Sequence, residues 1–490
     1  MLFNSYEFIF AFLPVTFFTY FYLNRKRLTE AAKAFLVFAS LFFYSWWNIA
    51  YLPIILASML FNYVVGVSLS KEQEHSRVSK QTLLLFGIVA NVALLGYFKY
   101  ADFLIENINL LTHMNIPPLH LALPLAISFF TFQQIAYLVD SYRGETREYD
   151  FLNYANFVTF FPQLIAGPIV HHAKMMPQFA RTRNKVIHYS NIAMGLFIFS
   201  IGLFKKVVIA DTFSVWANKG FDVAESLNFF EAWATSLSYT FQLYFDFSGY
   251  TDMAIGAALL FNIRLPINFF SPYKATSIQD FWRRWHMTLS RFLKEYIYIP
   301  IGGNRKGEVR TYVNLLVTFL IGGIWHGAGW TFVFWGFLHG LALVIQRVWN
   351  KLGFSMHYIL AWFLTFNFVN IAWVFFRAKE WDDALKVLGG MAGMNRIALP
   401  GFLQHQLAFL KPYGIDFGQW MEQLALSGDG GMKAIVWTLG GLIFILLFKN
   451  SNELLSRFSF RKRELIWILF CFIYAVLSLN KASDFLYFNF

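Results

Sequence analysis

Long hydrophobic runs recur along the whole of this 490-residue chain. Hydrophobic residues make up 57% of the sequence and charged residues only 14%, whereas a soluble domain carries roughly 25% charged residues. A run of about 20 apolar residues is long enough for a helix to cross the hydrocarbon core of a membrane. The composition therefore predicts an all-α, polytopic membrane protein.

The apolar runs predict about eleven or twelve transmembrane helices, with re-entrant and interfacial helices beside them. No internal repeat and no soluble linker domain is visible, so we expect residues 1–490 to form a single domain. The predicted helices lie near residues 6–23, 33–48, 50–70, 82–98, 121–139, 191–210, 232–262, 312–325, 329–348, 359–376, 433–448 and 464–480.

Basic residues gather in alternate connections between these helices, and the formal net charge is +12. Connections rich in lysine and arginine face the cytoplasm, which predicts that both termini lie outside. The excess also favours contact with anionic lipid rather than nucleic acid. The first apolar stretch has no basic segment before it and no cleavage site after it, so we expect a retained helix. The opposite connections, 99–119, 211–231 and 377–432, are predicted to be outer loops.

A histidine stands in the apolar stretch Leu320-Ile-Gly-Gly-Ile-Trp-His326-Gly-Ala-Gly-Trp330. An ionisable side chain at membrane depth costs several kcal/mol unless it faces protein or a water-filled cavity, so His326 is a candidate functional residue. The run 312–325 would rise only about 21 Å as a helix, against a core of about 30 Å. We therefore expect His326 inside the membrane, in a turn made by Gly322, Gly323, Gly327 and Gly329. The alternative is a structural histidine bonded to a neighbouring helix.

Two further segments depart from a plain spanning helix. Residues 157–169 are apolar but are interrupted by Pro162, Gly167 and Pro168, so we expect them to dip into the membrane and return. Asp280–Tyr298 has an apolar stripe with cations on other faces, which predicts an interfacial amphipathic helix that carries His286. The stripe consists of Phe281, Trp285, Thr288, Leu289 and Phe292, and the cations are Arg283, Arg284, Arg291 and Lys294.

The string Gly302-Gly-Asn304-Arg305-Lys306-Gly307 follows this predicted helix and adds flexible backbone and two cations. Such a segment can hold the phosphates of a nucleotide-linked acyl carrier, or it can rest on anionic lipid. Both readings stay open from the residues alone. The spacing is not that of a Walker A loop, so an ATPase is not indicated.

Several of these motifs, in this order, resemble the membrane-bound O-acyltransferase family, and most closely its bacterial types that act on alginate or peptidoglycan. The resemblance extends from the first helix to the last residue. The motifs are Pro162-Gln-Leu-Ile-Ala-Gly-Pro168-Ile, Tyr244-Phe-Asp-Phe-Ser-Gly-Tyr250-Thr-Asp-Met-Ala-Ile-Gly256, Phe281-Trp-Arg-Arg-Trp-His286-Met-Thr-Leu-Ser290, Tyr298-Ile-Pro-Ile-Gly-Gly-Asn-Arg-Lys-Gly307, Gly323-Ile-Trp-His326-Gly-Ala and the end Phe485-Leu-Tyr-Phe-Asn-Phe490.

The resemblance implies helices around a central tunnel, with a catalytic core at about residues 120–380. It also implies transfer of acetyl from a cytoplasmic donor, with acetyl-CoA expected, toward a hydroxyl outside. His326 then corresponds to the family's catalytic histidine and His286 to the histidine that lines the tunnel on the cytoplasmic side. A neutral imidazole can accept a proton from a hydroxyl that attacks a thioester. The donor-binding candidates are Arg283, Arg284, Asn304, Arg305 and Lys306.

Other polar residues carry weaker expectations. Asp246 and Ser248, with Trp325, are candidates for lining the tunnel or orienting a histidine, although an ion pair of Asp246 with Arg283 or Arg284 is the favoured interpretation. Asp252 is expected in a similar pair. His339 is expected to be a satisfied core histidine. No metal site is expected, at His171 and His172 or elsewhere, and Cys471 is the only cysteine, so disulfides are excluded.

Several alternatives stay open. An acyltransferase acting on lipids, proteins or teichoic acid has the same tunnel motifs. A transporter of polysaccharide precursors would also have broken helices, but no repeat supports one. A scaffold subunit would need neither histidine. The acceptor could be an alginate-like exopolysaccharide, acetylated cellulose or peptidoglycan, and the resemblance implies a periplasmic partner acetyltransferase of the serine-hydrolase-like type.

Overall fold

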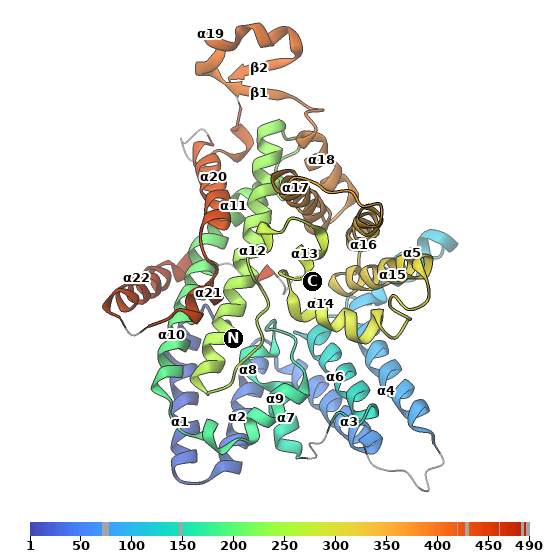
Figure 1. The fold of residues 1–490 in the computed structure, drawn as a ribbon, viewed down its shortest axis with the longest axis vertical. Helices are drawn as coiled ribbons and strands as arrows, with labels where there is room; N and C mark the ends of the chain where they lie inside the picture. The colour runs from blue at the N-terminus through green and yellow to red at the C-terminus, as the bar shows by residue number, and fades with distance from the viewer. Residues whose placement is uncertain are drawn as a thin grey trace.

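The computed structural model of this chain is a bundle of helices (Figure 1). It describes residues 1–70, 78–146, 150–418, 420–426, 431–459, 461–481 and 485–486. The last residues of the aromatic C-terminal motif, 487–490, lie outside the described residues. The predicted all-α membrane fold is confirmed, with one short pair of parallel strands as its β structure in the described residues.

The helices up to the centre of the chain are α1 (Leu13–Arg25), α2 (Thr29–Ser45), α3 (Leu52–Ser70), α4 (Lys80–Leu95), α5 (Ala101–Thr112), α6 (Ile127–Tyr142), α7 (Phe151–Thr159), α8 (Phe161–Leu164), α9 (His172–Ala180), α10 (Tyr189–Phe204), α11 (Asp211–Asn218) and α12 (Phe229–Leu260). The later elements are α13 (Ile278–Trp282), α14 (Met287–Leu293), α15 (Glu308–His326), α16 (Trp330–Lys351), α17 (Tyr358–Arg377), α18 (Trp381–Met391), β1 (Ile397–Pro400), α19 (Gln404–Leu407), β2 (Ile415–Gly418), α20 (Met432–Leu447), α21 (Ser451–Ser456) and α22 (Lys462–Ser478).

Within the described residues, six helical segments are long and apolar enough to cross a membrane, and α20 is apolar but shorter. Several other predicted spans are also helices, but α2, α6 and α22 have only 16 or 17 residues. The number of spans therefore stays a prediction. The six segments are Glu7–Arg25, Ile49–Ser70, Lys80–Thr112, Tyr189–Val223, Trp330–Lys351 and Tyr358–Arg377.

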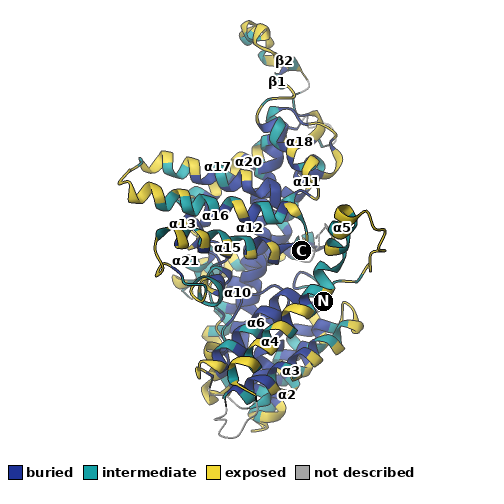
Figure 2. Cartoon of the chain, turned by 90° about the vertical axis from the view of Figure 1, so that its right-hand side faces the viewer, coloured by how far each residue is buried: buried dark blue, intermediate teal, exposed yellow. Residues whose placement is uncertain are grey.

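Helix α12 runs through the middle of the molecule, with α1 to α4 and α6 to α9 beside its lower half and α16 to α18 and α20 beside its upper half (Figure 1). It begins with a capping box in which Asn228 and Glu231 exchange side-chain to backbone hydrogen bonds. Nearly all of its 32 residues are buried, which is typical of a helix surrounded by others (Figure 2).

Small residues let α10 pack closely against α12. A Cβ atom added to Gly202 would lie 2.6 Å from the carbonyl oxygen of Gly249, and one added to Gly195 would lie 2.8 Å from that of Gly256. Glycines at such crossings allow the two backbones to approach, which is a common way to join helices in a membrane. The glycines therefore fix the central seam of the bundle.

The two ends of the chain meet on α12. The Tyr250 ring stacks on Phe3 at 4.7 Å between centroids and on Phe485 at 4.4 Å. Phe485 is buried at this point, so the first residue of the aromatic C-terminal motif belongs to the core.

Three predictions about local structure were wrong. The predicted outer loop 99–119 begins in a helix, because α4 continues through the π-helical turn Gly96–Tyr100 into α5. The predicted loop 211–231 likewise contains α11. The predicted helix over Asp280–Tyr298 is broken between α13 and α14, and its apolar stripe is buried in the core rather than at a membrane surface.

The helix before His326 is longer than predicted. Helix α15 has 19 residues, about 28 Å of rise, because it begins at Glu308 in a polar segment that hydrophobicity alone did not include. Gly322 and Gly323 are helical, so only Gly327 and Gly329 lie in the turn. Residues 157–169, predicted to be re-entrant, are buried among other helices, and Pro162 stands in the first turn of α8.

Candidate functional site

His326 is the last residue of α15, and a short turn connects it to α16. The helices of this hairpin approach closely because a Cβ at Gly323 would overlap the carbonyl oxygen of Phe332. Three aromatic rings lie around the buried imidazole, with centroids at 4.8 Å for Trp325 and 5.1 Å for both Trp335 and Phe376. These rings come from α15, α16 and α17, so the side chain lies among three helices.

The final carbonyl groups of α15 are capped by a neighbouring helix. Lys99 donates hydrogen bonds to the carbonyl oxygens of Trp325 at 2.7 Å and of His326 at 3.0 Å. Tyr100 donates to the carbonyl oxygen of Ile324 at 2.6 Å. The end of a helix leaves carbonyl groups without intrahelical partners, and a cation there is favourable. Neither residue was predicted to lie at the site, because Lys99 was assigned to an outer loop. A lysine within an apolar run is nevertheless a candidate functional residue.

His286 lies at the break between α13 and α14. Its φ of 42° is in the left-handed region, and this conformation ends the first helix and starts the second. The backbone N–H of Thr288 donates to the side-chain oxygen of Asn268 at 3.2 Å, which identifies that atom as an acceptor. The Nδ1 of His286 lies 3.1 Å from the same oxygen and must therefore be the donor.

This hydrogen bond sets the tautomer of His286. With the proton on Nδ1, the neutral ring carries its basic lone pair on Nε2. Burial lowers the pKa of His286 to about 3, because a charged imidazolium would be poorly solvated there. The Thr288 hydroxyl supports the arrangement: it donates to Asn268 at 2.9 Å and accepts from the Ile169 N–H at 3.0 Å. The broken segment 157–169 therefore helps to hold the histidine.

Trp325 connects the two histidines, which are 40 positions apart in the sequence. Its ring centroid lies 4.8 Å from that of His326 and 6.3 Å from that of His286. Its indole N–H donates to the Ser128 carbonyl at 3.3 Å. The structure thus gathers His286, Trp325 and His326 at one buried place.

A stack of aromatic rings leads away from Trp325. Phe132 stacks on Trp325 at 4.9 Å and on Phe292 at 4.0 Å, and Phe292 lies 4.9 Å from Tyr296. The rings belong to α15, α6, α14 and the π-helical turn Lys294–Tyr298. The stack joins the histidine pair to a second polar cluster.

That second cluster centres on Asp140 of α6. The carboxylate accepts from the Tyr296 hydroxyl at 2.8 and 2.9 Å and lies 3.2 Å from Nδ1 of His172. Nδ1 of His171 lies 3.2 Å from the same Tyr296 oxygen. Burial and the nearby Arg291 lower the pKa of His171. No acid lies near His171 and His172 in the sequence, because Asp140 is contributed by α6.

The predicted partner of Asp246 was wrong. Asp246 forms an ion pair with Lys206 at 2.8 Å and accepts the Leu486 N–H at 3.1 Å, while Arg284 pairs with Asp280 at 2.9 Å. Asp252 pairs with Lys205 at 2.8 Å. Both lysines lie within the apolar run predicted to be a helix, so their charges signalled the pairing. Ion pairs between α12 and the end of α10 are the structural role expected for the two aspartates.

The remaining sequence candidates lie elsewhere. Ser248 is buried on α12. His339 is buried, and Nδ1 accepts from the Trp282 indole at 3.2 Å, as a core histidine should. Of the donor-binding candidates, Arg284 is half-buried, and the others are exposed: Arg283, Asn304, Arg305 and Lys306.

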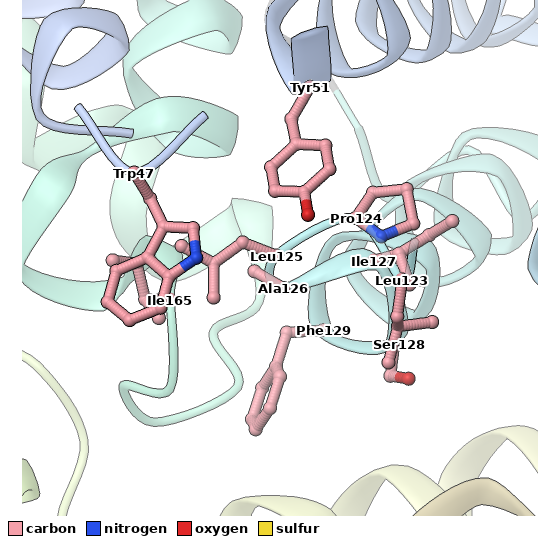
Figure 3. A pocket seen from close by; sticks show the side chains of 10 residues that line it. All are labelled: Trp47, Tyr51, Leu123, Pro124, Leu125, Ala126, Ile127, Ser128, Phe129 and Ile165. Atoms are coloured by element: carbon pink, nitrogen blue, oxygen red, sulfur yellow. The ribbon is translucent and has the colours of Figure 1, made fainter. Parts of the chain in front are cut away.

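A small cavity of about 80 Å³ lies beside the site (Figure 3). Trp47 and Tyr51 line it from the connection before α3, and Leu123 to Phe129 line it from the segment that enters α6. Ser128 belongs to this wall and also lies 3.2 Å from the Lys99 ammonium. Ser128 therefore connects the cavity to Lys99, the lysine that caps the end of α15.

His286 and His326 are thus both buried at helix ends within a bundle of apolar helices. The model of the membrane-bound O-acyltransferase family matches residues 41–379. The chain therefore belongs to this family and is an acyltransferase, as its motifs predicted. The transporter and scaffold interpretations lose their support.

Curated relatives agree with this assignment. The chain is 50% identical to the peptidoglycan O-acetyltransferase of Helicobacter pylori, over 100% of this chain and 98% of that protein. It is 36% identical to the probable alginate O-acetylase AlgI of Pseudomonas syringae pv. tomato, over 100% of both chains. The teichoic acid D-alanyltransferase of Streptococcus thermophilus is 26% identical over 46% of this chain and 57% of its own.

Proposed function

We propose that this chain takes acetyl from acetyl-CoA in the cytoplasm and passes it across the bacterial inner membrane for O-acetylation of peptidoglycan. The relative that carries the peptidoglycan name is 50% identical over the whole chain, and relatives named for alginate are 36% to 40% identical. Peptidoglycan is therefore the favoured acceptor. An alginate-like exopolysaccharide is the second candidate.

The observation that carries the proposal is that the rings of His286 and His326 both lie beside Trp325, with centroids at 6.3 Å and 4.8 Å from its ring. His326 is the general base. It takes the proton of the acceptor hydroxyl while the hydroxyl oxygen attacks the thioester carbonyl carbon. The new C–O bond forms, the C–S bond breaks, and the proton moves to the departing thiolate. The ring thus ends the cycle neutral, as it began.

His286 has a different role in this proposal. Its Nδ1 is committed to Asn268, which fixes the tautomer of the ring. A neutral ring with a fixed tautomer can orient the thioester or a hydroxyl. His286 therefore positions the donor near His326.

The cytoplasmic side of the proposal involves the exposed cations. Gly302 and Gly303 have φ values of 120° and 54°, which glycine accommodates, and Asn314 of α15 donates to the Gly303 carbonyl at 2.8 Å. This turn presents Arg305 and Lys306 to solvent on the predicted cytoplasmic side. Cations in that position suit the phosphates of a nucleotide-linked donor.

The outer side of the proposal involves the small cavity in Figure 3. The basic connection 25–27 is predicted to be cytoplasmic. Trp47 and Tyr51 lie at the other end of the next helix, on the predicted outer side. An acceptor, or a partner acetyltransferase of the serine-hydrolase-like type, would approach His326 from there. Both termini lie outside in this arrangement, consistent with the stacking of Phe3 and Phe485 on one tyrosine.

A bacterial strain in which this chain is the sole such enzyme tests the proposal. Purified peptidoglycan is treated with mild base, and the released acetate is measured for the wild type and for His326→Ala at equal protein levels. We expect acetate from the wild type and almost none from the variant. Equal acetate from both strains would contradict the role of His326, and acetylated exopolysaccharide with unacetylated peptidoglycan would select the second acceptor.

A further inference from the structure

Lys99 is the cation that contacts the backbone of the histidine site. It lies on the π-helical turn between α4 and α5, inside the apolar segment Lys80–Thr112. Its ammonium donates to the carbonyl oxygens of Trp325 and His326 and lies 3.2 Å from the Ser128 hydroxyl. Among the described residues, no carboxylate lies within 4.0 Å of this ammonium. Its contacts include a hydroxyl, the negative ends of two peptide dipoles and the Tyr100 ring, whose centroid lies 6.0 Å away.

The neighbouring contact shows what capping alone requires. Tyr100 satisfies the Ile324 carbonyl with a neutral hydroxyl at 2.6 Å. An unsatisfied carbonyl at membrane depth costs several kcal/mol, so donors are needed where α15 ends. A neutral donor meets that need at Ile324, whereas the next two carbonyls receive a lysine. A charged side chain in an apolar span is unfavourable in free energy, which indicates that the charge has a functional role.

The geometry gives that charge a place in the reaction. A chain of contacts runs from the cavity in Figure 3 through the Ser128 hydroxyl and the Lys99 ammonium to the His326 carbonyl. Attack on a thioester builds negative charge on the carbonyl oxygen, and a protonated lysine in a site of low dielectric constant stabilises such charge. The same ammonium fixes the backbone from which the His326 ring projects.

We infer that Lys99 is a positioning residue for acyl transfer: it fixes the last turn of α15, and hence the direction of the His326 imidazole, and it keeps a positive charge beside the reacting centre. The inference rests on the proposed function. It assigns Lys99 no bond to the acyl group and no proton transfer.

Purified enzyme in detergent tests the inference through steady-state acetyl transfer from acetyl-CoA. The variants are Lys99→Met, which removes donor and charge, Lys99→Arg, which keeps both, and Tyr100→Phe, which removes only the neighbouring neutral cap. We expect Lys99→Met to lower kcat roughly 100-fold with little change in KM for acetyl-CoA, because fixed charge acts mainly in the transition state. Lys99→Arg should recover most of that loss, and Tyr100→Phe should lose far less kcat than Lys99→Met.

Melting curves of each variant separate catalysis from folding. If Lys99→Met does not fold, Lys99→Gln takes its place, since glutamine keeps a neutral donor without the charge. A wild-type kcat in the variant without the charge would overturn the inference. Losses of kcat in Lys99→Arg and Tyr100→Phe as large as the loss in Lys99→Met would also overturn it. His326→Ala is measured in parallel: if it is as active as the wild type, the proposed function fails, whereas failure at Lys99 alone leaves that function standing.

Discussion

His286 donates its Nδ1 proton to the side-chain oxygen of Asn268 at 3.1 Å, and this bond decides which nitrogen of a buried histidine is basic. Replacing Asn268 by Ala leaves a buried donor without its acceptor, which costs about 1–3 kcal/mol. We expect Asn268→Ala to lower acetyl transfer roughly tenfold or more, with a lower melting temperature. Thr288→Ser, which keeps the hydroxyl of the same network, is the matched control. Undiminished activity in Asn268→Ala would show that the tautomer is unimportant.

The left-handed backbone at His286 allows a sharper test of that side chain. Asparagine tolerates a positive φ better than most residues, so His286→Asn should fold more stably than His286→Ala. Both remove Nε2, and both should reduce kcat roughly 100-fold, because a misplacement of reacting groups by about 1 Å costs about that much. Melting temperature and kcat are measured together. A variant with asparagine that folds and turns over normally would exclude His286 from the reaction.

The seam between α10 and α12 predicts a purely structural effect. A side chain at Gly202 would press against the Gly249 carbonyl, 2.6 Å from its Cβ, and overpacking typically costs about 1–3 kcal/mol. We expect Gly202→Val to lower the melting temperature in detergent. The control is Gly440→Ala on α20, where no atom lies within 4 Å of an added Cβ. Equal melting temperatures for the two variants would contradict the close packing of α10 and α12.

Much of the fold could be predicted from hydrophobicity, because a helix of a given length leaves a run of that length in the sequence. The break at His286 could not, since the stripe around it fits a continuous helix and the contact that interrupts it comes from Asn268. Asp246 was paired with the wrong cation because the choice among buried lysines and arginines depends on how α10 meets α12. Lys99 escaped notice because a charge near the end of an apolar run looks like the start of a loop.

The cluster at Asp140 predicts a dependence of stability on pH. His171 has a lowered pKa in the folded protein, mainly from burial and then from Arg291, with Glu295 and Asp140 acting in the opposite direction. The unfolded chain therefore binds more protons as the pH falls below about 6.5, and the free energy of unfolding contributed by this group decreases. Unfolding curves between neutral and mildly acidic pH should show this loss. It should be smaller in His171→Gln, and an identical slope in both proteins would contradict the assignment.

The central claim is that His326 carries acetyl transfer from acetyl-CoA. The most direct measurement uses purified protein with radiolabelled acetyl-CoA and compares the rate of thioester consumption in the wild type and in His326→Ala, with melting curves to match folding. We expect turnover by the wild type and a rate at background in the variant. Equal rates in two folded proteins would contradict it.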